Sequence, residues 1–503
     1  MTRGTVVCSQ PAAADAGVST LRAGGNAFDA AVAAALVQAV VDPLNCGIGG
    51  FGVAQLREAG SSLPVHLGFH ARAPLLARPD MFEVTGEMSL APLAAGTWPV
   101  RDDLNQIGYL SVGVPGTVAG LAEIARCYCR LGWTELSAPA ILACREGWTV
   151  TAEQHAEWTR EGPASRIDAR TRLAWTAYGA SVYTNGGAIR RPGERVVNPD
   201  HARTLARLAE AGPEDFYQGE IARAIAEDFE RNGGLIRAAD LEGFTVDRAP
   251  ALEASYRGLR LTTVPAPAGG SVLLEILERL EPHDLRAVGH NSAAYLRLLA
   301  GAFRPAFEGM RDRLGDPGAP EETTHLVTWD EAGNAVVLTH TLGAASGVIT
   351  PGLGFIFNGA LHRFAPMPGH PNSIGPGKRR VTGMSPTIVW RGSEPAILVG
   401  GAGGNSIVAG IAQVILNLVE FEMDPLAAVS APRIHCEGPV ITLEGRFPAS
   451  VAAELAEAGE QVVVSAAGFD RLVAASVNAL ATPAWPRPGP GPDPRSAGVA
   501  FSA

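Results

Sequence analysis

The chain has 503 residues, and its 40 Lys and Arg against 51 Asp and Glu give a formal net charge of −11. This acidic balance argues against a general nucleic-acid binder, which normally presents a basic face. Hydrophobic residues make up 47% and charged residues 18% of the chain, as in a globular rather than a disordered protein. The 59 Gly and 37 Pro follow no regular period, which excludes collagen and indicates many turns between strands and helices.

The N-terminal residues 1–11 lack the apolar stretch of a secretory signal peptide. The longest apolar run, residues 30–41, is interrupted by Gln38 and is too short to span a bilayer. The six cysteines lack the spacing of a zinc site or a disulfide framework. We therefore expect a cytoplasmic protein with reduced thiols, and we expect no cofactor, bound metal, membrane or nucleic acid.

Two helices separated by a glycine pair are the first elements predicted along the chain. Apolar residues recur at helical spacing over residues 12–23. Asn26 can cap the next helix, residues 27–41. Because this second helix is apolar almost all round, we expect it to be buried. A glycine-rich stretch then leads into a predicted strand at residues 53–56.

The middle of the chain alternates between helical patterns and short strands. Helices are predicted over residues 116–143 and 202–232. Residues 259–264 and 387–389 are rich in β-branched residues and predict strands.

The C-terminal part contains a predicted hairpin. Residues 323–341 alternate strongly and predict two strands joined by a loop at residues 330–334. A strand at residues 396–399 leads through a glycine cluster into a helix at 407–419, and the Pro- and Gly-rich residues 483–492 predict a connector. Such frequent hairpins among helices favour a layered mixed α/β or α+β domain over a purely parallel sheet.

The motif Glu322-Thr323-Thr324-His325 is the candidate catalytic site. It follows a turn-rich stretch at residues 315–320 and begins a predicted strand. The alternative is that the threonine pair only reflects the preference of threonine for strands. A threonine exposed there by chain cleavage would be an N-terminal nucleophile. Its own α-amine, with a reference pKa of about 8, could serve as the general base for its hydroxyl.

The loop at residues 401–406, Gly-Ala-Gly-Gly-Asn-Ser, follows a predicted strand and opens a predicted helix. This arrangement is close to a dinucleotide-binding fingerprint, but the third glycine position is Ser406. We favour another use for the loop, in which backbone N–H groups at a helix N-terminus stabilise a developing oxyanion.

At these motifs the sequence resembles the γ-glutamyltranspeptidase family, and the resemblance extends essentially from end to end. The matching motifs occur in the family's order, at residues 24–32, 112–120, 216–219, 232–236, 265–270, 314–317, 323–325, 333–336, 384–387 and 431–433.

The resemblance implies an N-terminal-nucleophile hydrolase with an αββα sandwich. Self-cleavage between Glu322 and Thr323 would give a large subunit of residues 1–322 and a small subunit of residues 323–503, which together form one domain. Thr341 matches the family's second active-site threonine. Gly403 and Gly404 match the glycine pair that forms the oxyanion hole, in agreement with the use of this loop favoured above.

The substrate-binding positions depart from the family's pattern. The family's carboxylate-binding arginine is His70 here, although Arg72 would point to the same face of an extended segment and could partly compensate. Its asparagine after Thr-Leu is Gly343, and its two serines correspond to Thr382 and Gly383.

The residues that bind the α-amino group in the family also differ. The family's glutamine and aspartate fall at Ala360 and Arg363. An arginine in place of the aspartate would repel a substrate ammonium at a cost of several kcal/mol, or about a thousandfold in affinity. In the alternative interpretation, Arg363 swings into solvent as a surface residue.

These observations predict an autoprocessing threonine hydrolase that acts on a small anionic non-glutamyl substrate. His70, Arg72, His362 and Arg363 would make the pocket suit an anionic acyl group. Relatives of this kind include cephalosporin acylases, oxamate amidohydrolases and homologues in pyrroline natural-product pathways that cleave a carbon–carbon bond. The alternatives are a γ-glutamyl hydrolase or transferase with a rearranged pocket, and a non-catalytic binding protein. A homo-oligomer is compatible with the sequence.

Overall fold

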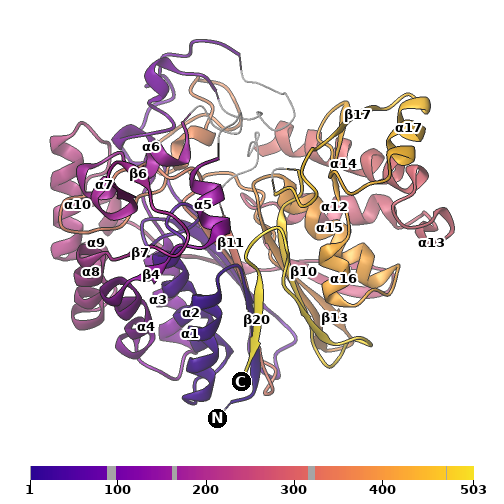
Figure 1. The fold of residues 1–503 in the computed structure, drawn as a ribbon, viewed down its shortest axis with the longest axis horizontal. Helices are drawn as coiled ribbons and strands as arrows, with labels where there is room; N and C mark the ends of the chain where they lie inside the picture. The colour runs from indigo at the N-terminus through magenta and orange to yellow at the C-terminus, as the bar shows by residue number, and fades with distance from the viewer. Residues whose placement is uncertain (1, 88–97, 161–166, 315–322, 472) are drawn as a thin grey trace.

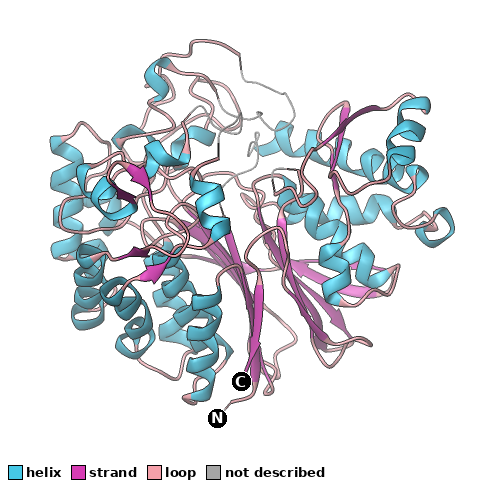
Figure 2. Cartoon of the chain, in the orientation of Figure 1, coloured by secondary structure: helices cyan, strands magenta, loops and turns pink. Residues whose placement is uncertain are grey.

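Two antiparallel sheets stacked face to face form the centre of the molecule (Figures 1 and 2). The computed structural model describes residues 2–87, 98–160, 167–314, 323–471 and 473–503. The strands of the first sheet are, in spatial order, β20 (Val499–Ser502), β1 (Gly4–Cys8), β11 (Thr324–Asp330), β12 (Ala335–Thr341), β2 (Phe51–Arg57), β3 (Val65–Phe69) and β8 (Asp247–Pro250). Those of the second are β19 (Gly489–Gly491), β18 (Ser476–Ala481), β14 (Glu394–Ala402), β13 (Thr387–Arg391), β10 (Leu259–Thr263) and β9 (Leu252–Tyr256).

Helices cover the outer faces of both sheets, so the layers are helix, sheet, sheet and helix (Figure 1). The first sheet is covered by α1 (Pro11–Arg22), α2 (Ala27–Val41), α3 (Thr117–Tyr128), α4 (Trp133–Glu146), α8 (Pro199–Ala211) and α10 (Glu220–Arg231). The second is covered by α12 (Gly270–Leu280), α14 (Ala293–Leu314) and α15 (Ser406–Val419). The layered αββα prediction is confirmed.

Shorter elements complete the two lobes. The remaining helices are η1 (Arg101–Asp103), η2 (Tyr109–Ser111), α5 (Ala152–Trp158), α6 (Ala169–Leu173), α7 (Ala177–Tyr183), α9 (Asp215–Gln218), α11 (Ala238–Glu242), α13 (Leu285–Val288), η3 (Ala360–Arg363), α16 (Pro425–Ser430) and α17 (Ala449–Glu457). The remaining strands form three small sheets, from β4 (Trp148–Thr149) and β7 (Arg195–Val196), from β5 (Thr184–Asn185) and β6 (Ala188–Ile189), and from β15 (Ile434–His435), β16 (Val440–Leu443) and β17 (Gln461–Val464).

Helix α2 is buried along its whole length, as its composition predicts. The side chain of Asn26 accepts hydrogen bonds from the N–H groups of Phe28 and Asp29, and the Asp29 carboxylate accepts in return from the N–H of Asn26. This capping box satisfies free N–H groups at the start of a helix that is almost completely buried. The helix packs against β11 and β12 and supports them from outside.

The β11–β12 hairpin is confirmed, and it lies in the middle of the first sheet. Alternate side chains of a strand point to opposite faces. Leu326 therefore packs among the helices that cover the sheet, whereas Val327 faces the second sheet. With both faces covered, the hairpin forms a rigid base for the residues at its ends.

Three predicted elements are different in the structure. The helical pattern over residues 116–143 is two helices, α3 and α4, because the backbone becomes extended at Cys129 and restarts at Gly132. The pattern over residues 202–232 is three helices, since α8 ends at Gly212, which has a φ of +93°. The predicted connector at 483–492 includes strand β19, which extends the second sheet.

Within the described ranges, no helix is long and apolar enough to cross a membrane.

Candidate active site

Thr323 and Thr341 lie side by side at one end of the β11–β12 hairpin. Thr324 pairs with His340, so the residue before β11 faces the last residue of β12. The Thr323 Oγ donates to the Thr341 Oγ over 3.3 Å, and the Gly343 N–H donates to the same Thr341 oxygen over 2.7 Å. Both threonines are buried, with Thr323 only 3% exposed. The structure brings the predicted nucleophile into contact with the predicted second threonine, and Gly343 orients the latter.

Two buried histidines of the hairpin are uncharged. The His325 Nδ1 lies 2.8 Å from the Thr339 Oγ, and the His340 Nε2 lies 3.1 Å from the Gln38 Oε1. Burial disfavours the imidazolium form and lowers the pKa of each histidine to about 3. A ring that binds a proton only near pH 3 is a poor acceptor for the proton of a hydroxyl at neutral pH. Neither histidine therefore suits the role of general base.

Arg471 holds the backbone carbonyl of Thr323. Its guanidinium donates to that oxygen and, over 2.9 Å, to the Asn45 side-chain oxygen. The guanidinium also forms an ion pair with Glu157 at 3.1 Å. Asn45 and Glu157 thereby orient Arg471, and Arg471 fixes the main chain at the candidate nucleophile.

Asp42 lies behind this group and is buried. Its carboxylate accepts a hydrogen bond from the Asn45 Nδ2 over 2.7 Å. Burial and the negative charge of Glu157 raise the pKa of Asp42 to about 7, although Asn45 and Arg471 oppose the shift. Asn45 thus links the Asp42 carboxyl group to Arg471, the residue that holds the Thr323 carbonyl.

Gly403 and Gly404 form the turn between β14 and α15, with φ angles of +141° and +67°. Glycine is needed here because other residues rarely adopt these angles. The Ser406 Oγ donates to the Gly403 carbonyl over 2.7 Å, and a β-carbon at Gly403 would lie 3.0 Å from the Ala475 Cα. The loop is fixed on both sides at the N-terminus of a buried helix, where N–H groups have no partner within the helix.

Thr382 and Gly383 lie against the same loop. A β-carbon at Gly383 would collide with the carbonyl oxygen of Gly404. The Thr382 Oγ accepts from the Met384 N–H over 3.2 Å, which shapes the turn. The predicted site residues Gly383 and Gly404, 21 positions apart in the sequence, are therefore in direct backbone contact.

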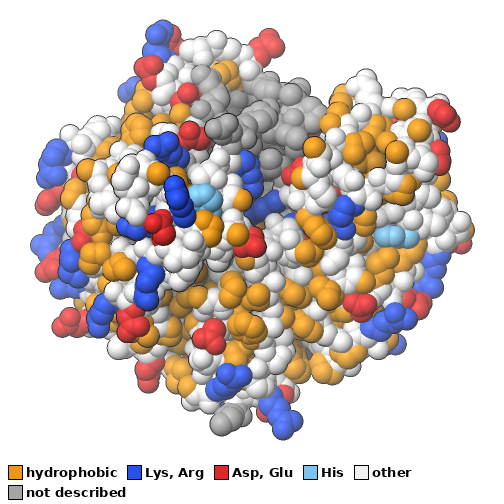
Figure 3. Space-filling model, viewed as in Figure 1, with side chains coloured by type: hydrophobic (Ala, Val, Ile, Leu, Met, Phe, Trp, Pro, Cys, Tyr) orange, Lys and Arg blue, Asp and Glu red, His pale blue; other side chains and the backbone are white. Residues whose placement is uncertain are grey.

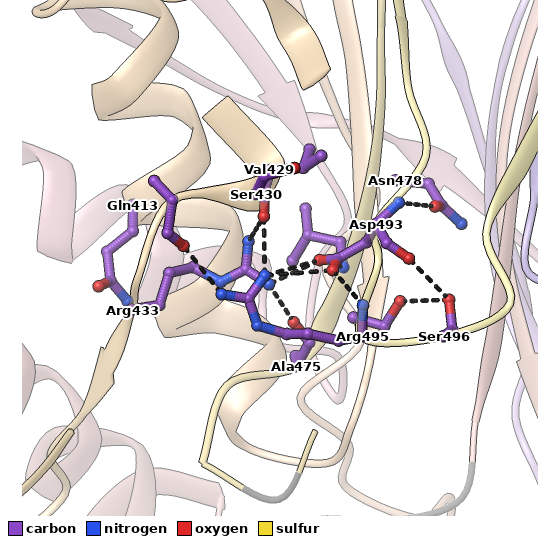
Figure 4. A network of polar contacts seen from close by, with 12 residues as sticks. Gln413, Val429, Ser430, Arg433, Ala475, Asn478, Asp493, Arg495 and Ser496 are labelled. Carbon is purple, nitrogen blue, oxygen red and sulfur yellow. Dashed lines mark hydrogen bonds and ion pairs between the residues drawn. The ribbon is translucent and has the colours of Figure 1, made fainter. Parts of the chain in front are cut away.

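A buried cluster of charged residues lies next to Ala475 (Figure 4). It consists of Arg433, Glu444, Asp493 and Arg495. Arg433 lies 2.6 Å from Asp493 and also donates to the Ala475 carbonyl over 2.6 Å. Burial and the charge of Arg495 lower the pKa of Arg433 to about 10, while Asp493 and Glu444 oppose that shift. Because Ala475 lies against Gly403, this cluster fixes the backbone that packs behind the glycine loop.

Residues 70–73 continue β3 and lie between two other segments. On one side the Val114 N–H donates to the Arg72 carbonyl over 2.8 Å. On the other, the Arg380 N–H donates to the Ala71 carbonyl over 3.1 Å, and the Ala73 N–H donates to the Lys378 carbonyl over 2.8 Å. The predicted binding segment is therefore paired with residues 378–380.

His70 and Arg72 differ in their surroundings. His70 is buried, and its pKa lies well below its ordinary value because of burial, with His66 and three nearby arginines adding positive charge. The Arg72 guanidinium lies over the Phe244 ring, donates to the Thr245 carbonyl over 2.8 Å and pairs with Asp247 at 3.4 Å. Arg72 is thus held on the side of β8.

Arg363 is only 5% exposed, so the interpretation that it swings into solvent is wrong. It ends η3, which also contains Ala360 and His362. The His362 Nδ1 donates to the Gly359 carbonyl, which fixes that ring. Ala360 packs against the backbone of residue 113, next to the segment that carries His70 and Arg72.

Gly343 lies between the second threonine and a buried arginine. Its φ is +62°, in the left-handed region. A β-carbon there would lie 3.7 Å from the Phe51 ring and 3.8 Å from the Arg380 Cζ. The position of the predicted binding residue Gly343 therefore borders a guanidinium. In the space-filling view, Lys and Arg side chains also gather where the two lobes meet (Figure 3).

The sequence model described as Gamma-glutamyltranspeptidase matches residues 13–322 and 318–502. The chain belongs to this family. The Acylase ACY 1 proenzyme of Pseudomonas sp. (strain V22) is 32% identical over 519 residues, covering 95% of this chain and 90% of that protein. The Glutathione hydrolase proenzyme of Pseudomonas sp. (strain A14) is 31% identical over 488 residues, covering 86% and 81%. The crystal structure of cephalosporin acylase from Bacillus halodurans has a TM-score of 0.82 at 26% identity, covering 99% of this chain and 96% of that one.

This gamma-glutamyltranspeptidase-family protein is an N-terminal-nucleophile hydrolase that cleaves acyl bonds, as the resemblance implied. Four further residues near the threonine pair are not predicted from the sequence. Asn45 could have been flagged, because it stands just before the glycine-rich stretch, and Arg380 because it follows another arginine close to Thr382. Arg471 and Glu157 carry no local signal, since they reach the site only through the fold.

Proposed function

We propose that Thr323 is the nucleophile of an autoprocessing hydrolase that cleaves the amide bond of a small anionic acyl substrate without an α-ammonium group. The contact between the Thr323 and Thr341 hydroxyls carries this proposal, and the Gly403–Gly404 turn at the start of α15 supports it. The threonine pair supplies a nucleophile and a hydroxyl that orients it, and the turn supplies backbone N–H groups suited to an oxyanion.

Self-cleavage comes first. The Thr323 Oγ attacks the carbonyl carbon of Glu322, a residue that lies outside the described part of the chain. The C–N bond breaks, the nitrogen takes up a proton, and the Glu322 acyl group is left as an ester on the hydroxyl. Water opens that ester. The products are chains of 322 and 181 residues, the second beginning with a free threonine amine.

Turnover uses the amine that cleavage releases. The amine takes the proton from the Thr323 Oγ as the oxygen attacks the substrate acyl carbon. The N–H groups of Gly403 and Gly404 stabilise the oxyanion, an effect worth about 3 kcal/mol per donor in comparable sites. The leaving amine takes the proton, and water then hydrolyses the acyl ester on Thr323.

Substrate preference follows from the charges of the binding side. Buried Arg363 stands where relatives of this family place an aspartate against the substrate ammonium, so it disfavours a γ-glutamyl group. The same positive charge favours a carboxylate. The sequence similarity to a glutathione hydrolase supports the alternative function, a γ-glutamyl hydrolase or transferase. The sequence similarity to an acylase supports the preferred function.

The cleavage step is tested on purified protein. The wild type should run as two fragments, and N-terminal sequencing should place Thr323 at the start of the smaller one. Thr323→Ala should stay a single chain, whereas Thr324→Ala, one residue away, should still be cut. A fully active wild type that is never cleaved would overturn the mechanism.

The substrate class is tested with two anilides that differ only in the α-amine, glutaryl p-nitroanilide and γ-glutamyl p-nitroanilide. We expect a higher kcat/KM on the glutaryl compound and feeble activity on glutathione. Glutathione hydrolysis above about 10⁴ M⁻¹s⁻¹, within the ordinary enzyme range, would instead establish the alternative function.

A further inference from the structure

Arg471 places a positive charge beside the backbone of Thr323. Its guanidinium donates to the Thr323 carbonyl oxygen and, over 2.9 Å, to the side-chain oxygen of Asn45. Within one residue, the backbone nitrogen and the carbonyl oxygen are at most about 3.6 Å apart. The guanidinium therefore lies within about 7 Å of the Thr323 nitrogen. Self-cleavage would turn this nitrogen from an amide into an amine, but it leaves the bonds between the nitrogen and the carbonyl unchanged.

The carboxylate that contacts this guanidinium lies on another side of it. Glu157 accepts from the Nη1 of Arg471 over 3.1 Å, whereas the Nη2 holds the Thr323 carbonyl. The Asn45 Nδ2 donates to the other Glu157 oxygen over 3.0 Å and fixes its position. The positive end of this ion pair is thus the end that contacts Thr323.

Four other titratable side chains around this end of the hairpin carry no charge at neutral pH. His325 and His340 are neutral, because burial lowers the pKa of each to about 3. Burial also raises the pKa of the Cys8 thiol to about 12 and that of the Cys46 thiol well above its ordinary value. None of the four therefore compensates the charge of Arg471.

The ionisable side chains that lie around Arg471 and Thr323 are Asp42 behind Asn45, Asp470 next to Arg471 in the chain, Glu157 on its guanidinium, and Arg380 beyond Gly343. Within the described ranges, Arg471 is the one charged side chain that forms a hydrogen bond with Thr323. A positive charge so close disfavours a second positive charge and lowers the pKa of an amine.

We propose that the positive charge of Arg471 keeps the α-amine of Thr323 unprotonated at neutral pH, which makes Arg471 a positioning residue for the general base. The inference rests on the proposed function, because self-cleavage must first release that amine. At the reference pKa of about 8, only about a tenth of an α-amine is unprotonated at pH 7. An ammonium cannot accept the proton of the Thr323 hydroxyl, so Arg471 raises the fraction of the enzyme that can react.

The first test is the pH dependence of kcat/KM on glutaryl p-nitroanilide, whose acidic limb reports the base of the free enzyme. Arg471→Gln removes the positive charge, so the limb should move to higher pH by about one pH unit. Arg471→Lys keeps the charge and should leave the limb near its wild-type position. Glu157→Gln removes the negative charge of the ion pair and should move the limb to lower pH. A loss of structure alone would not move the limb in opposite directions.

Two further variants serve as controls. Arg304 also holds a backbone carbonyl, that of Gly438 over 2.9 Å, and pairs with Glu460 at 2.6 Å, so Arg304→Gln should leave the limb unchanged. Asp42 itself titrates in this range, since burial and the charge of Glu157 raise its pKa to about 7. The limb should remain in Asp42→Asn. A limb that disappears there would belong to Asp42 and would overturn the inference.

A second readout needs no substrate. The chain has a single lysine, so the cleaved enzyme carries three amines, those of Lys378, Thr323 and the N-terminal residue. Reductive methylation with ¹³C-formaldehyde labels them, and ¹³C NMR follows each signal through a pH titration. The Thr323 signal, absent from uncut Thr323→Ala, should titrate at lower pH in the folded wild type than in the same enzyme unfolded in urea. Arg471→Gln should remove most of that difference.

The outcomes separate this inference from the function on which it rests. If Arg471→Gln is not cut, Glu157→Gln and the titration of the wild type still decide. An enzyme cut before Thr323 overturns the inference alone if its limb stays in place in these variants, or if its Thr323 amine titrates as in the unfolded chain. A chain that is never cut there overturns the proposed function as well.

Discussion

Arginines gather in two regions of this molecule, behind the glycine loop and beside the candidate acyl-binding site, and the two groups differ in burial. Behind the loop, Arg433 and Arg495 face Asp493 and Glu444, and all four side chains are 0% exposed, while the partly exposed Arg446 also pairs with Glu444 at 3.0 Å. Beside the candidate binding site, Arg72 and Arg379 share Asp247, and their side chains are 22% and 44% exposed.

The difference separates two uses of the same side chain. Arginines enclosed with carboxylates, away from water, hold the chain in place, as Arg433 does at Ala475. Ion pairs that water reaches are screened and contribute less to stability. Burial therefore indicates which of these arginines are structural.

The largest effect is expected from breaking the buried charge cluster behind the glycine loop. Asp493→Asn leaves two buried guanidinium groups with one carboxylate and should lower the free energy of unfolding by about 3–5 kcal/mol, measured by urea denaturation. Asp247→Asn is the matched change in the other region. Because the Asp247 side chain is 31% exposed, its loss should cost about 1 kcal/mol or less. Equal losses would show that the two regions do not differ as described.

Reversing a charge on the binding side should change specificity rather than stability. Arg363→Asp places a carboxylate where it can attract an α-ammonium, so the ratio of glutaryl to γ-glutamyl hydrolysis should fall by about a hundredfold or more. Adding Gly343→Asn should extend the shift. The measurement is kcat/KM on the two anilides, and an unchanged ratio in the double variant would exclude Arg363 from the pocket.

A change at the second threonine, Thr341, should affect kcat and not KM. Thr341→Ala removes the hydroxyl that orients Thr323, so kcat should fall about tenfold or more while KM stays within about threefold. Thr339→Ala is a suitable control, because its hydroxyl contacts His325 and not the nucleophile. Steady-state kinetics on the cleaved enzymes distinguish the two variants. A rise in KM with unchanged kcat would assign Thr341 to substrate binding.

The smallest effect concerns Asp42, whose buried carboxyl group lies behind Asn45 and Arg471. Burial beside Glu157 raises the pKa of Asp42 from 3.8 to about 7 in the folded protein. The folded state therefore holds this proton more tightly than the unfolded state. The resulting stabilisation is complete below about pH 4 and is lost as the pH rises through about 7. Asp42→Asn should lessen the fall in melting temperature between pH 5 and pH 8, and an unchanged fall would mean that Asp42 does not titrate there.

The sequence was a good guide where short-range patterns decide the structure. The Asn26 cap, the β11–β12 hairpin and the turn at Gly403 and Gly404 all depend on residues within a few positions of one another, and each is present as predicted. Helix boundaries were predicted less well, because a single extended residue such as Cys129 can divide a continuous apolar pattern into two helices.

The residues that surround the Thr323–Thr341 pair could not be predicted, because long-range packing brings them there. Arg471 meets Glu157 across 314 positions, and Arg380 reaches Gly343 through the pairing of residues 71–73 with 378–380. The burial of Arg363 had the same origin. A pattern in the sequence shows which residue types are available, but only the fold shows which of them face each other.

The order of strands in the sheets gives the proposed cut an unusual consequence. In the first sheet β1, from the 322-residue piece, lies between β20 and β11 of the 181-residue piece, and in the second sheet β13 of the smaller piece pairs with β10 of the larger. The two products are interwoven rather than docked. Separating them would require unzipping both sheets, so dissociation and denaturation become one event and subunits will not exchange on mixing. Folding as one uncut precursor therefore places the two halves in register, which they would have difficulty reaching as two separate chains.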